Sequence, residues 1–317
     1  MKIIKAFVFT FLFVSVCSAQ EDIVQLKNVS DTILNTKRIL AVSGELDAIK
    51  TMQQLFPGKL YKLSDRNTFI SWKCKNCKTA SYTDVNGEEG DQIFPYERGV
   101  ATRLLSNLDY TDSKGNQFKL LLFNHSVYDE DGLQTSRFSG GLVGVAKFAK
   151  NNNIWEMRSF QPGVAAFGAF AQAPKPKLTE IGEDQYAFTL LHVNGGGGGP
   201  FEGTLYLVAG FDGKYQPIME VHDYELTNVE SVTWSSSYTV VNDPAKKHFR
   251  DIVIKTKGSF NKTAQAKDEF EVNLPAEIAA MAKTKKQFTF EIEKRFSFKG
   301  KSYKMTAKPI VKFLNVK

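Results

Sequence analysis

The chain has 317 residues, and its 41 lysines and arginines against 34 aspartates and glutamates give a formal net charge of +7. Hydrophobic residues make up 42% and charged residues 24%, a composition that excludes a disordered chain and supports a sizeable core. This length suits one large domain or two ordinary ones.

The first twenty residues predict a secretory signal peptide. Two lysines precede an apolar run at residues 6–16, and the small side chain of Ala19 predicts cleavage before Gln20. The run is too short for a helix that spans a bilayer, which takes about 20 residues. We therefore expect residues 1–19 to be removed and the mature chain to be exported, to a periplasm or outside the cell, without a membrane span.

The next part of the mature chain, residues 20–58, predicts a helical N-terminal segment. The helical stretches are expected at residues 21–40 and 45–56. The second stretch carries mostly apolar residues three and four positions apart and ends at Pro57. A change of pattern at residue 59 therefore marks the end of the helical segment.

Residues 59–317 predict a β-rich region with alternating, aromatic-rich stretches. The strands fall into three consecutive groups at residues 101–160, 176–224 and 231–310, joined by hairpin turns such as "DSKGN" and "FDGKY". A division near 225–231 would separate the last two groups. We expect a mainly β fold of consecutive antiparallel meanders, either propeller-like or a sandwich or barrel.

A short helical insertion is expected inside the third group, in the stretch "PAEIAAMAK" at residues 275–283. It begins with Pro275, a residue suited to the first helical position because its fixed φ matches the helix. This helix is the only one that the sequence predicts after residue 58.

Cys74 and Cys77, in "SWKCKNCKT", are the two cysteines left after export. An oxidising compartment favours a structural disulfide between them. The neighbouring lysines would favour a thiolate, so a thiol-active protein is an alternative function. Against it, no helical periodicity follows the pair, and the histidines that a zinc site would need are scattered singly.

Charge is distributed unevenly along the chain. Residues 244–317 hold 18 lysines and arginines against 7 aspartates and glutamates. These basic residues are dispersed, so we expect a solvated face there, with an anion-binding surface as the alternative. Acidic turns at residues 82–92 and 128–134 lack the full ligand spacing of a calcium loop and are expected to be solvated turns.

Five consecutive glycines follow His192 in "HVNGGGGGPFEG". A phosphate-binding loop needs glycines that lead from a strand into a helix, usually with a nearby lysine. Here an alternating strand follows, and no lysine or arginine occurs between Lys177 and Lys214. We expect a flexible hairpin connection, while a ligand that contacts the main chain is the alternative. The candidate ligand-binding residues are His192, Gly195, Gly196, Gly197, Gly198 and Gly199.

The stretch "MEVHDYEL" carries a second group of candidate residues. Strand alternation places Glu220, His222 and Tyr224 on one face. Glu220 and His222 could bind a ligand, share a metal with His192, or act as a general acid/base pair. A metal-dependent or acid/base hydrolase built on these residues is therefore the main alternative function, although neither spacing is diagnostic.

Between residues 118 and 224 the chain contains, in order, "FKLLLFNHS", "GLVGVAKF", "NNIWEMRSF", "GVAAFGAFAQAP", "KLTEIGEDQYAFTL" and "FEGTLYLVAG". This order resembles exported β-rich bacterial proteins of unknown function, and "RFSFKGKSYKM" is similar to their final hairpin. The shared motifs consist of turn glycines and strand aromatics. The resemblance implies an exported, β-rich protein and no particular activity.

The sequence carries none of the common hydrolase signatures, such as Gly-x-Ser-x-Gly or His-Glu-x-x-His. We therefore expect a non-enzymatic protein that binds a ligand or supports the cell envelope. No cofactor and no metal are expected. A glycan or another envelope protein is the expected kind of partner, and nucleic acid is not.

Overall fold

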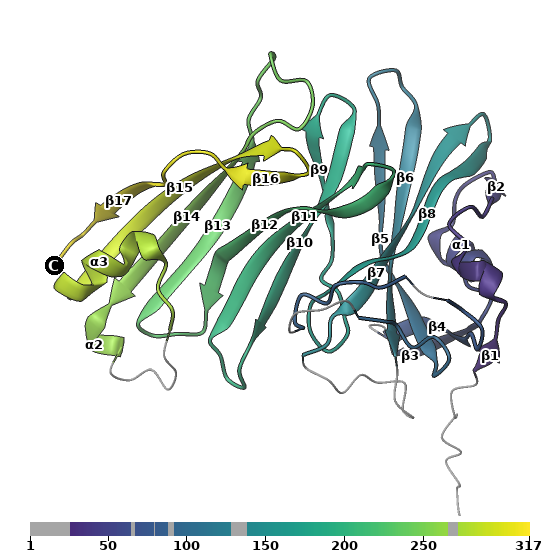
Figure 1. Cartoon of the computed structure of the whole chain (residues 1–317), viewed down its shortest axis with the longest axis horizontal. Helices are drawn as coiled ribbons and strands as arrows, with labels where there is room; N and C mark the ends of the chain where they lie inside the picture. The colour runs from purple at the N-terminus through teal and green to yellow at the C-terminus, as the bar shows by residue number, and fades with distance from the viewer. Residues whose placement is uncertain (1–25, 65–66, 79, 88–91, 128–137, 266–271) are drawn as a thin grey trace, which may run out of the picture.

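Two sheets and a few short helices make up the fold, and the sheets lie side by side (Figure 1). The strand pairs are antiparallel apart from one, so the expected mainly β fold of consecutive antiparallel meanders is confirmed. The expected signal peptide, residues 1–19, lies outside the described residues. The computed structural model describes residues 26–64, 67–78, 80–87, 92–127, 138–265 and 272–317.

The first sheet has the strand order β1-β4-β5-β6-β7-β8-β2, with β3 paired beside β4. The exceptional parallel pair is β1 with β4. The predicted turn at residues 112–116 joins β5 to β6, and the Asp112 carboxylate accepts hydrogen bonds from the backbone N–H groups of Lys114 and Asn116. The strands are β1 (Lys27–Asn28), β2 (Ala41–Ser43), β3 (Lys59–Ser64), β4 (Asn67–Lys73), β5 (Val100–Thr111), β6 (Gln117–Val127), β7 (Gly141–Asn151) and β8 (Ile154–Phe167).

The second sheet has the strand order β16-β15-β14-β13-β12-β11-β10-β9, with β17 paired beside β15. The second and third predicted strand groups both belong to it, and residues 228–231 connect its neighbouring strands β12 and β13. The chain changes sheet earlier, between β8 and β9. The strands are β9 (Lys177–Gly182), β10 (Gln185–Gly195), β11 (Phe201–Phe211), β12 (Lys214–Thr227), β13 (Val232–Val240), β14 (Ile252–Asn261), β15 (Gln287–Lys299), β16 (Ser302–Met305) and β17 (Ile310–Leu314).

The helices are short. The expected helices at 45–56 and 275–283 are confirmed as α1 and α3, and the Asp47 carboxylate caps α1 by accepting from the Lys50 N–H at 3.0 Å. Within the described ranges, no helix is long and apolar enough to cross a membrane. The helices are the 3₁₀ turn η1 (Asp31–Leu34), α1 (Ala48–Leu55), α2 (Lys262–Gln265) and α3 (Ala276–Thr284).

The expected helix at 21–40 is wrong for the described residues of that range. From residue 26 onward the segment forms β1 and the single 3₁₀ turn η1. The Ser30 hydroxyl caps η1 by accepting from the Thr32 N–H, and β1 pairs with β4. Ile33 then packs into the core of the first sheet. Burial in a distant core has therefore determined the conformation of this segment rather than its local periodicity.

The two faces of the first sheet pack against different parts of the molecule. Neighbouring residues of β6 point to opposite faces, so Phe123 packs with Phe56 beneath α1 while Leu122 points the other way. Leu122 meets Phe188 and Val208 of the second sheet. Both faces of β6 are thus buried, which explains its nearly continuous apolar run.

The second sheet curls, and β16 lies against β12. One face of β10 and β11 packs on the first sheet, and the other face joins a core with residues of β14, β15 and β16. The sequence left open a propeller-like arrangement and a sandwich or barrel, and the structure has packed sheets.

The contact between the sheets predicts a large effect of truncating Phe188, whose side chain is fully buried in it. We expect Phe188→Ala to lower the free energy of unfolding by about 3–5 kcal/mol, because it leaves a cavity between the sheets. Urea unfolding followed by tryptophan fluorescence measures this. The matched control is Phe138→Ala, which truncates a side chain that is 67% exposed. Similar effects of the two substitutions would show that the sheets do not pack as described.

Candidate functional site

The glycine run forms the expected hairpin connection between β10 and β11. Gly195 pairs with Phe201, and the loop between them contains a cis peptide bond before Pro200. The Asn228 side-chain amide donates to the Gly198 carbonyl, and a Cβ on Gly199 would lie 2.7 Å from the same amide nitrogen. The loop is thus packed against the β12–β13 connection, and this contact accounts for the glycine at position 199.

His192 is buried at the junction of the two sheets. Its Nδ1 accepts a hydrogen bond from the backbone N–H of Gly168, which follows β8, at 2.9 Å. Nearby, the Asn194 amide donates to Asn86 at 2.6 Å. Burial lowers the pKa of His192, so its ring is neutral and acts as an acceptor near neutral pH. His192 therefore ties β10 to the first sheet.

Asp84 shows that the described part of the acidic turn at 82–92 is not simply solvated. Its carboxylate accepts from the backbone N–H groups of Asn86 and Gly140 at 3.0 and 2.9 Å. The expectation of a solvated turn does not hold for this half-buried carboxylate, because it satisfies two half-buried backbone donors. The other expected acidic turn, residues 128–134, lies outside the described residues.

Glu220 and His222 do lie together, on the exposed side of β12. The Glu220 carboxylate lies 3.3 Å from Nε2 of His222 and accepts from the Tyr206 hydroxyl at 2.9 Å. The His222 side chain is 72% exposed. His192 packs edge-on against the Tyr206 ring rather than against the carboxylate. Among the described residues, no three His, Cys, Asp or Glu side chains are placed to hold a metal.

The expected position of Tyr224 on the same face as His222 is wrong. Asp223 has a φ of 54°, and the pairing of β12 with β11 shifts register beside it. This irregularity turns Tyr224 to the buried face, where it joins the core of the second sheet. Strict alternation fails here because residues 222–224 of β12 stand opposite Thr204 alone in the pairing with β11.

The expected disulfide between Cys74 and Cys77 is present. Cys74 is buried, and its N–H donates to the Tyr96 carbonyl at 2.9 Å. The bridge closes a tight loop after β4 and packs on the core beneath α1. It thereby fixes Tyr96, a residue that lies on the border of a cleft described below.

A buried histidine that the sequence did not single out lies at the centre of this core. His125 is fully buried on β6, and five aromatic rings have centroids within 4.9–6.1 Å of its own. They come from α1, from β4, from the segment before β5, and from β6. The rings belong to Phe56, Trp72, Phe94, Tyr96 and Phe123, and we call this group with His125 the aromatic box.

A short chain of hydrogen bonds holds the histidine in the aromatic box. Trp72 Nε1 donates to Thr102 Oγ1 at 2.8 Å, and that hydroxyl lies 2.7 Å from Nδ1 of His125. Because an indole nitrogen can only donate, the hydroxyl accepts from it and gives its own hydrogen to Nδ1. The ring hydrogen is then on Nε2, which has no hydrogen-bond partner among the described residues. The nearby Pro162 backbone raises the pKa of His125, but burial lowers it more.

A cleft of about 580 Å³ opens above the aromatic box, where the two sheets meet. Its walls come from the segment after η1, the loop after the disulfide, β8 and the β11–β12 turn. Gln161 closes one border by forming two hydrogen bonds with the backbone of Tyr215, at 2.8 and 3.0 Å. The cleft is therefore built only when both sheets are in place.

A bulge in β8 shapes the floor of the cleft. Residues 162–164 stand opposite Gly144 alone in the pairing with β7. A Cβ on Gly144 would lie 2.6 Å from the Pro162 carbonyl oxygen, so the close approach needs a glycine. The apolar floor includes Leu34, Ala80, Leu142, Phe160 and Pro162.

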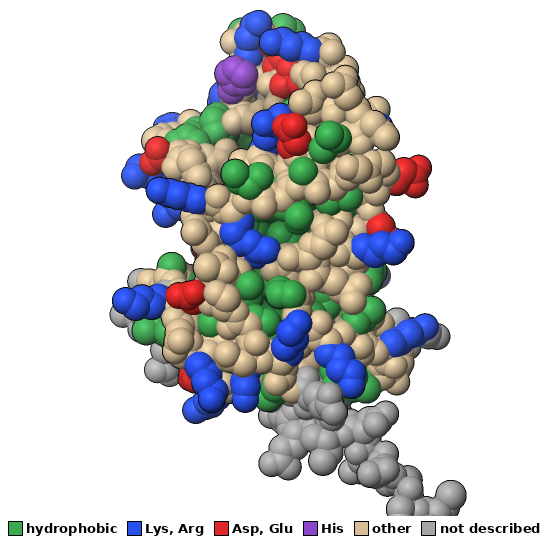
Figure 2. Space-filling view, turned by 90° about the vertical axis from the view of Figure 1, so that its right-hand side faces the viewer, with side chains coloured by type: hydrophobic (Ala, Val, Ile, Leu, Met, Phe, Trp, Pro, Cys, Tyr) green, Lys and Arg blue, Asp and Glu red, His purple; other side chains and the backbone are tan. Residues whose placement is uncertain are grey.

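Two lysines give the cleft a positive rim. Lys78 and Lys214 come from opposite sheets, and neither has an ion-pair partner among the described residues. Tyr82 and Tyr96 also line the cleft, and burial raises the pKa of both phenols, so they remain neutral hydrogen-bonding groups. Figure 2 shows lysines and arginines dispersed over the end of the molecule that carries the first sheet, with apolar side chains between them.

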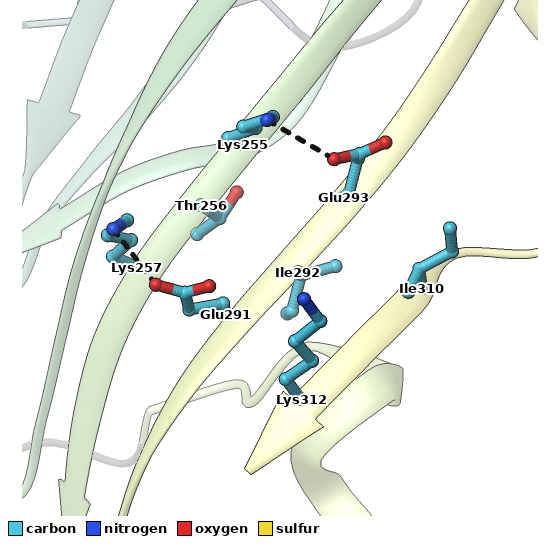
Figure 3. A pocket seen from close by; sticks show the side chains of 8 residues that line it. All are labelled: Lys255, Thr256, Lys257, Glu291, Ile292, Glu293, Ile310 and Lys312. Carbon is cyan, nitrogen blue, oxygen red and sulfur yellow. Dashed lines mark ion pairs between the residues drawn. The ribbon is translucent and has the colours of Figure 1, made fainter. Parts of the chain in front are cut away.

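A second, smaller depression of about 180 Å³ lies on the second sheet across β14, β15 and β17. Figure 3 shows that its charges pair across strands, Lys255 with Glu293 at 3.5 Å and Lys257 with Glu291 at 2.9 Å. Four of the five charged groups thus compensate each other, and Lys312 adds one more cation. At this depression the basic residues are thus largely paired on the surface.

No family model, curated protein or solved structure matches this chain. The resemblance to exported β-rich bacterial proteins therefore stays a prediction.

The aromatic box predicts an acid-sensitive fold. Burial lowers the pKa of His125 to about 3, whereas in the unfolded chain it is about 6.5. Between these two pKa values only the unfolded chain binds the proton. The neutral His125 therefore makes its full contribution to the free energy of unfolding above about pH 6.5. As the pH falls towards 3, the free energy of unfolding should decrease by up to about 1.4 kcal/mol per pH unit.

Urea unfolding of the wild-type chain and of His125→Gln across this pH range tests the expectation. Glutamine cannot take up a proton there, so the wild type should lose stability more steeply than the variant. Since other groups that titrate are common to both proteins, the difference between the two slopes isolates His125. Equal slopes would contradict a neutral, buried imidazole.

Proposed function

We propose that this chain is an exported, non-enzymatic binding protein and that its binding site is the cleft between the two sheets. The observation that carries the proposal is the combination of an apolar floor with Lys78 and Lys214 on opposite walls, two lysines that have no ion-pair partner among the described residues. The signal-peptide pattern of residues 1–19 supports export. The size of the cleft lies within the range of ligand pockets in proteins.

The ligand class follows from the cleft's lining. Tyr96 and Phe160 are each only 3% exposed, so their rings offer little face for stacking against a sugar. Leu34, Ala80 and Pro162 are more open and present apolar surface. An amphipathic anion, with an apolar body over the floor and a carboxylate between the lysines, fits this arrangement better than a neutral glycan.

The other candidate groups favour structural roles. His192 accepts from a backbone N–H, Cys74 and Cys77 are joined, and the Glu220–His222 pair lies on an exposed strand face. None of them lines the cleft. A binding role therefore accounts for more of the described geometry than a hydrolase or a thiol-active protein.

Calorimetric titration of the mature chain with octanoate, and with 1-octanol as the uncharged counterpart, tests the proposal. We expect octanoate to bind more tightly than the alcohol. The double variant Lys78→Gln/Lys214→Gln should bind octanoate about tenfold more weakly, since two partly exposed ion pairs contribute up to ~1 kcal/mol each.

The matched control is Lys301→Gln, which removes an exposed lysine in the β15–β16 turn. It should leave the affinity unchanged. Equal affinities of the wild type and the double variant, or equal binding of the alcohol and the acid, would reject the cleft as a site for an amphipathic anion.

A further inference from the structure

A separate cavity of about 250 Å³ lies on the first sheet, next to the segment that leads to the second sheet. It is formed by β4, β5 and β6 together with residues 172–173 of the segment that connects the two sheets. Asn124 holds this segment in place, because its amide donates to the Ala171 carbonyl and accepts from the Ala173 N–H. The cavity therefore has a fixed wall made from the connection.

Arg103 of β5 lines this cavity, and several contacts hold its guanidinium in place. Its guanidinium donates twice to Asn67 Oδ1, at 3.2 and 2.9 Å, and once to Ser126 Oγ at 2.7 Å. It also lies over the Phe69 ring, 5.0 Å from the centroid. The side chain is thus immobilised before any ligand arrives, which lowers the entropic cost of binding.

The charge of Arg103 has no anionic partner among the described residues. Its contacts are all to neutral oxygens, and of the five N–H donors of a guanidinium these three hydrogen bonds leave two. Burial lowers its pKa to about 10, so the group stays charged near neutral pH while its charge is incompletely compensated. An anion in the cavity would supply the missing compensation.

The charges of the other half-buried arginines of the described chain have partners within the fold, although Nε of Arg250 has no hydrogen-bond partner there. Arg38 donates to three backbone carbonyls at the end of α1 and of η1. Arg250 lies 3.7 Å from the Glu180 carboxylate. Arg103 differs from both because its side chain lines a cavity and, among the described residues, donates to no backbone carbonyl and no carboxylate.

The rest of the cavity lining indicates which kind of anion fits. Thr68 and Gln172 offer side-chain polar groups that make no hydrogen bond within the described ranges, and Leu104 and Leu105 offer apolar surface. A planar carboxylate matches the fork of a guanidinium, and a short apolar body matches the leucines. We infer that this cavity is a second binding site, distinct from the cleft, for the carboxylate of a small organic acid held by Arg103.

The melting temperature of the mature chain, titrated with butyrate at constant ionic strength, tests the inference, because a ligand of the folded state raises it by mass action. We expect butyrate to raise the melting temperature and 1-butanol not to. Arg103→Lys, which keeps a charge but loses the planar fork, should bind butyrate about tenfold more weakly. The control Arg98→Lys alters an exposed arginine just before β5 and should bind it like the wild type.

Three results would overturn the inference. Arg103→Lys could respond to butyrate as the wild type does, or inorganic phosphate could bind more tightly than butyrate. The third is that Lys78→Gln/Lys214→Gln loses the butyrate response, which would show that butyrate binds in the cleft rather than in the cavity beside Arg103. If Arg103→Lys does not fold, Gln172→Leu, at an exposed position of the lining, replaces it and should weaken butyrate binding.

Discussion

The molecule depends on the contact between one face of β6–β8 and one face of β10–β11. Apolar side chains such as Leu122 and Phe188 supply the attraction, since burying each large one stabilises the fold by about 1.5–3 kcal/mol. Hydrogen bonds set the alignment at the borders, with Gln161 bound to Tyr215 on one side and Gly168 bound to His192 on another. The cleft lies along the border that Gln161 closes.

The aromatic box makes the first sheet a rigid base for the cleft. It packs against α1 on one side and, through Tyr96, reaches the cleft on the other. The disulfide loop strengthens this link, because the Cys74 N–H holds the Tyr96 carbonyl. A histidine at the centre lets the Trp72 and Thr102 side chains form hydrogen bonds inside an otherwise apolar core, at the cost of sensitivity to acid.

Local features of the fold could be predicted from the sequence, and long-range ones could not. The turns at 112–116 and 212–213 carry residues that adopt tight turn conformations, such as Gly213 with a φ of 79°. The segment 26–40 was predicted wrongly because its partners are β4 and a distant core. For the same reason the sequence could not show the cleft, whose walls are more than a hundred residues apart along the chain.

Among the candidate site residues, too, only those that depend on local sequence could be predicted. The disulfide was predictable because its cysteines are three residues apart. His125 was counted among the scattered histidines, although its apolar strand "KLLLFNHSV" indicated a buried position. Arg103 gave no signal, because an unpaired cation can be recognised only when its surroundings in space are known.

The measurement that tests the central claim most directly is an amide NMR titration of residues 20–317 with octanoate. If the cleft between the sheets is the binding site, shifts should appear together at Tyr82 and Gly163 of the first sheet's side and at Gly213 and Lys214 of the second. Shifts confined to one sheet, or to the glycine loop at residues 195–199, would contradict a site built by both sheets.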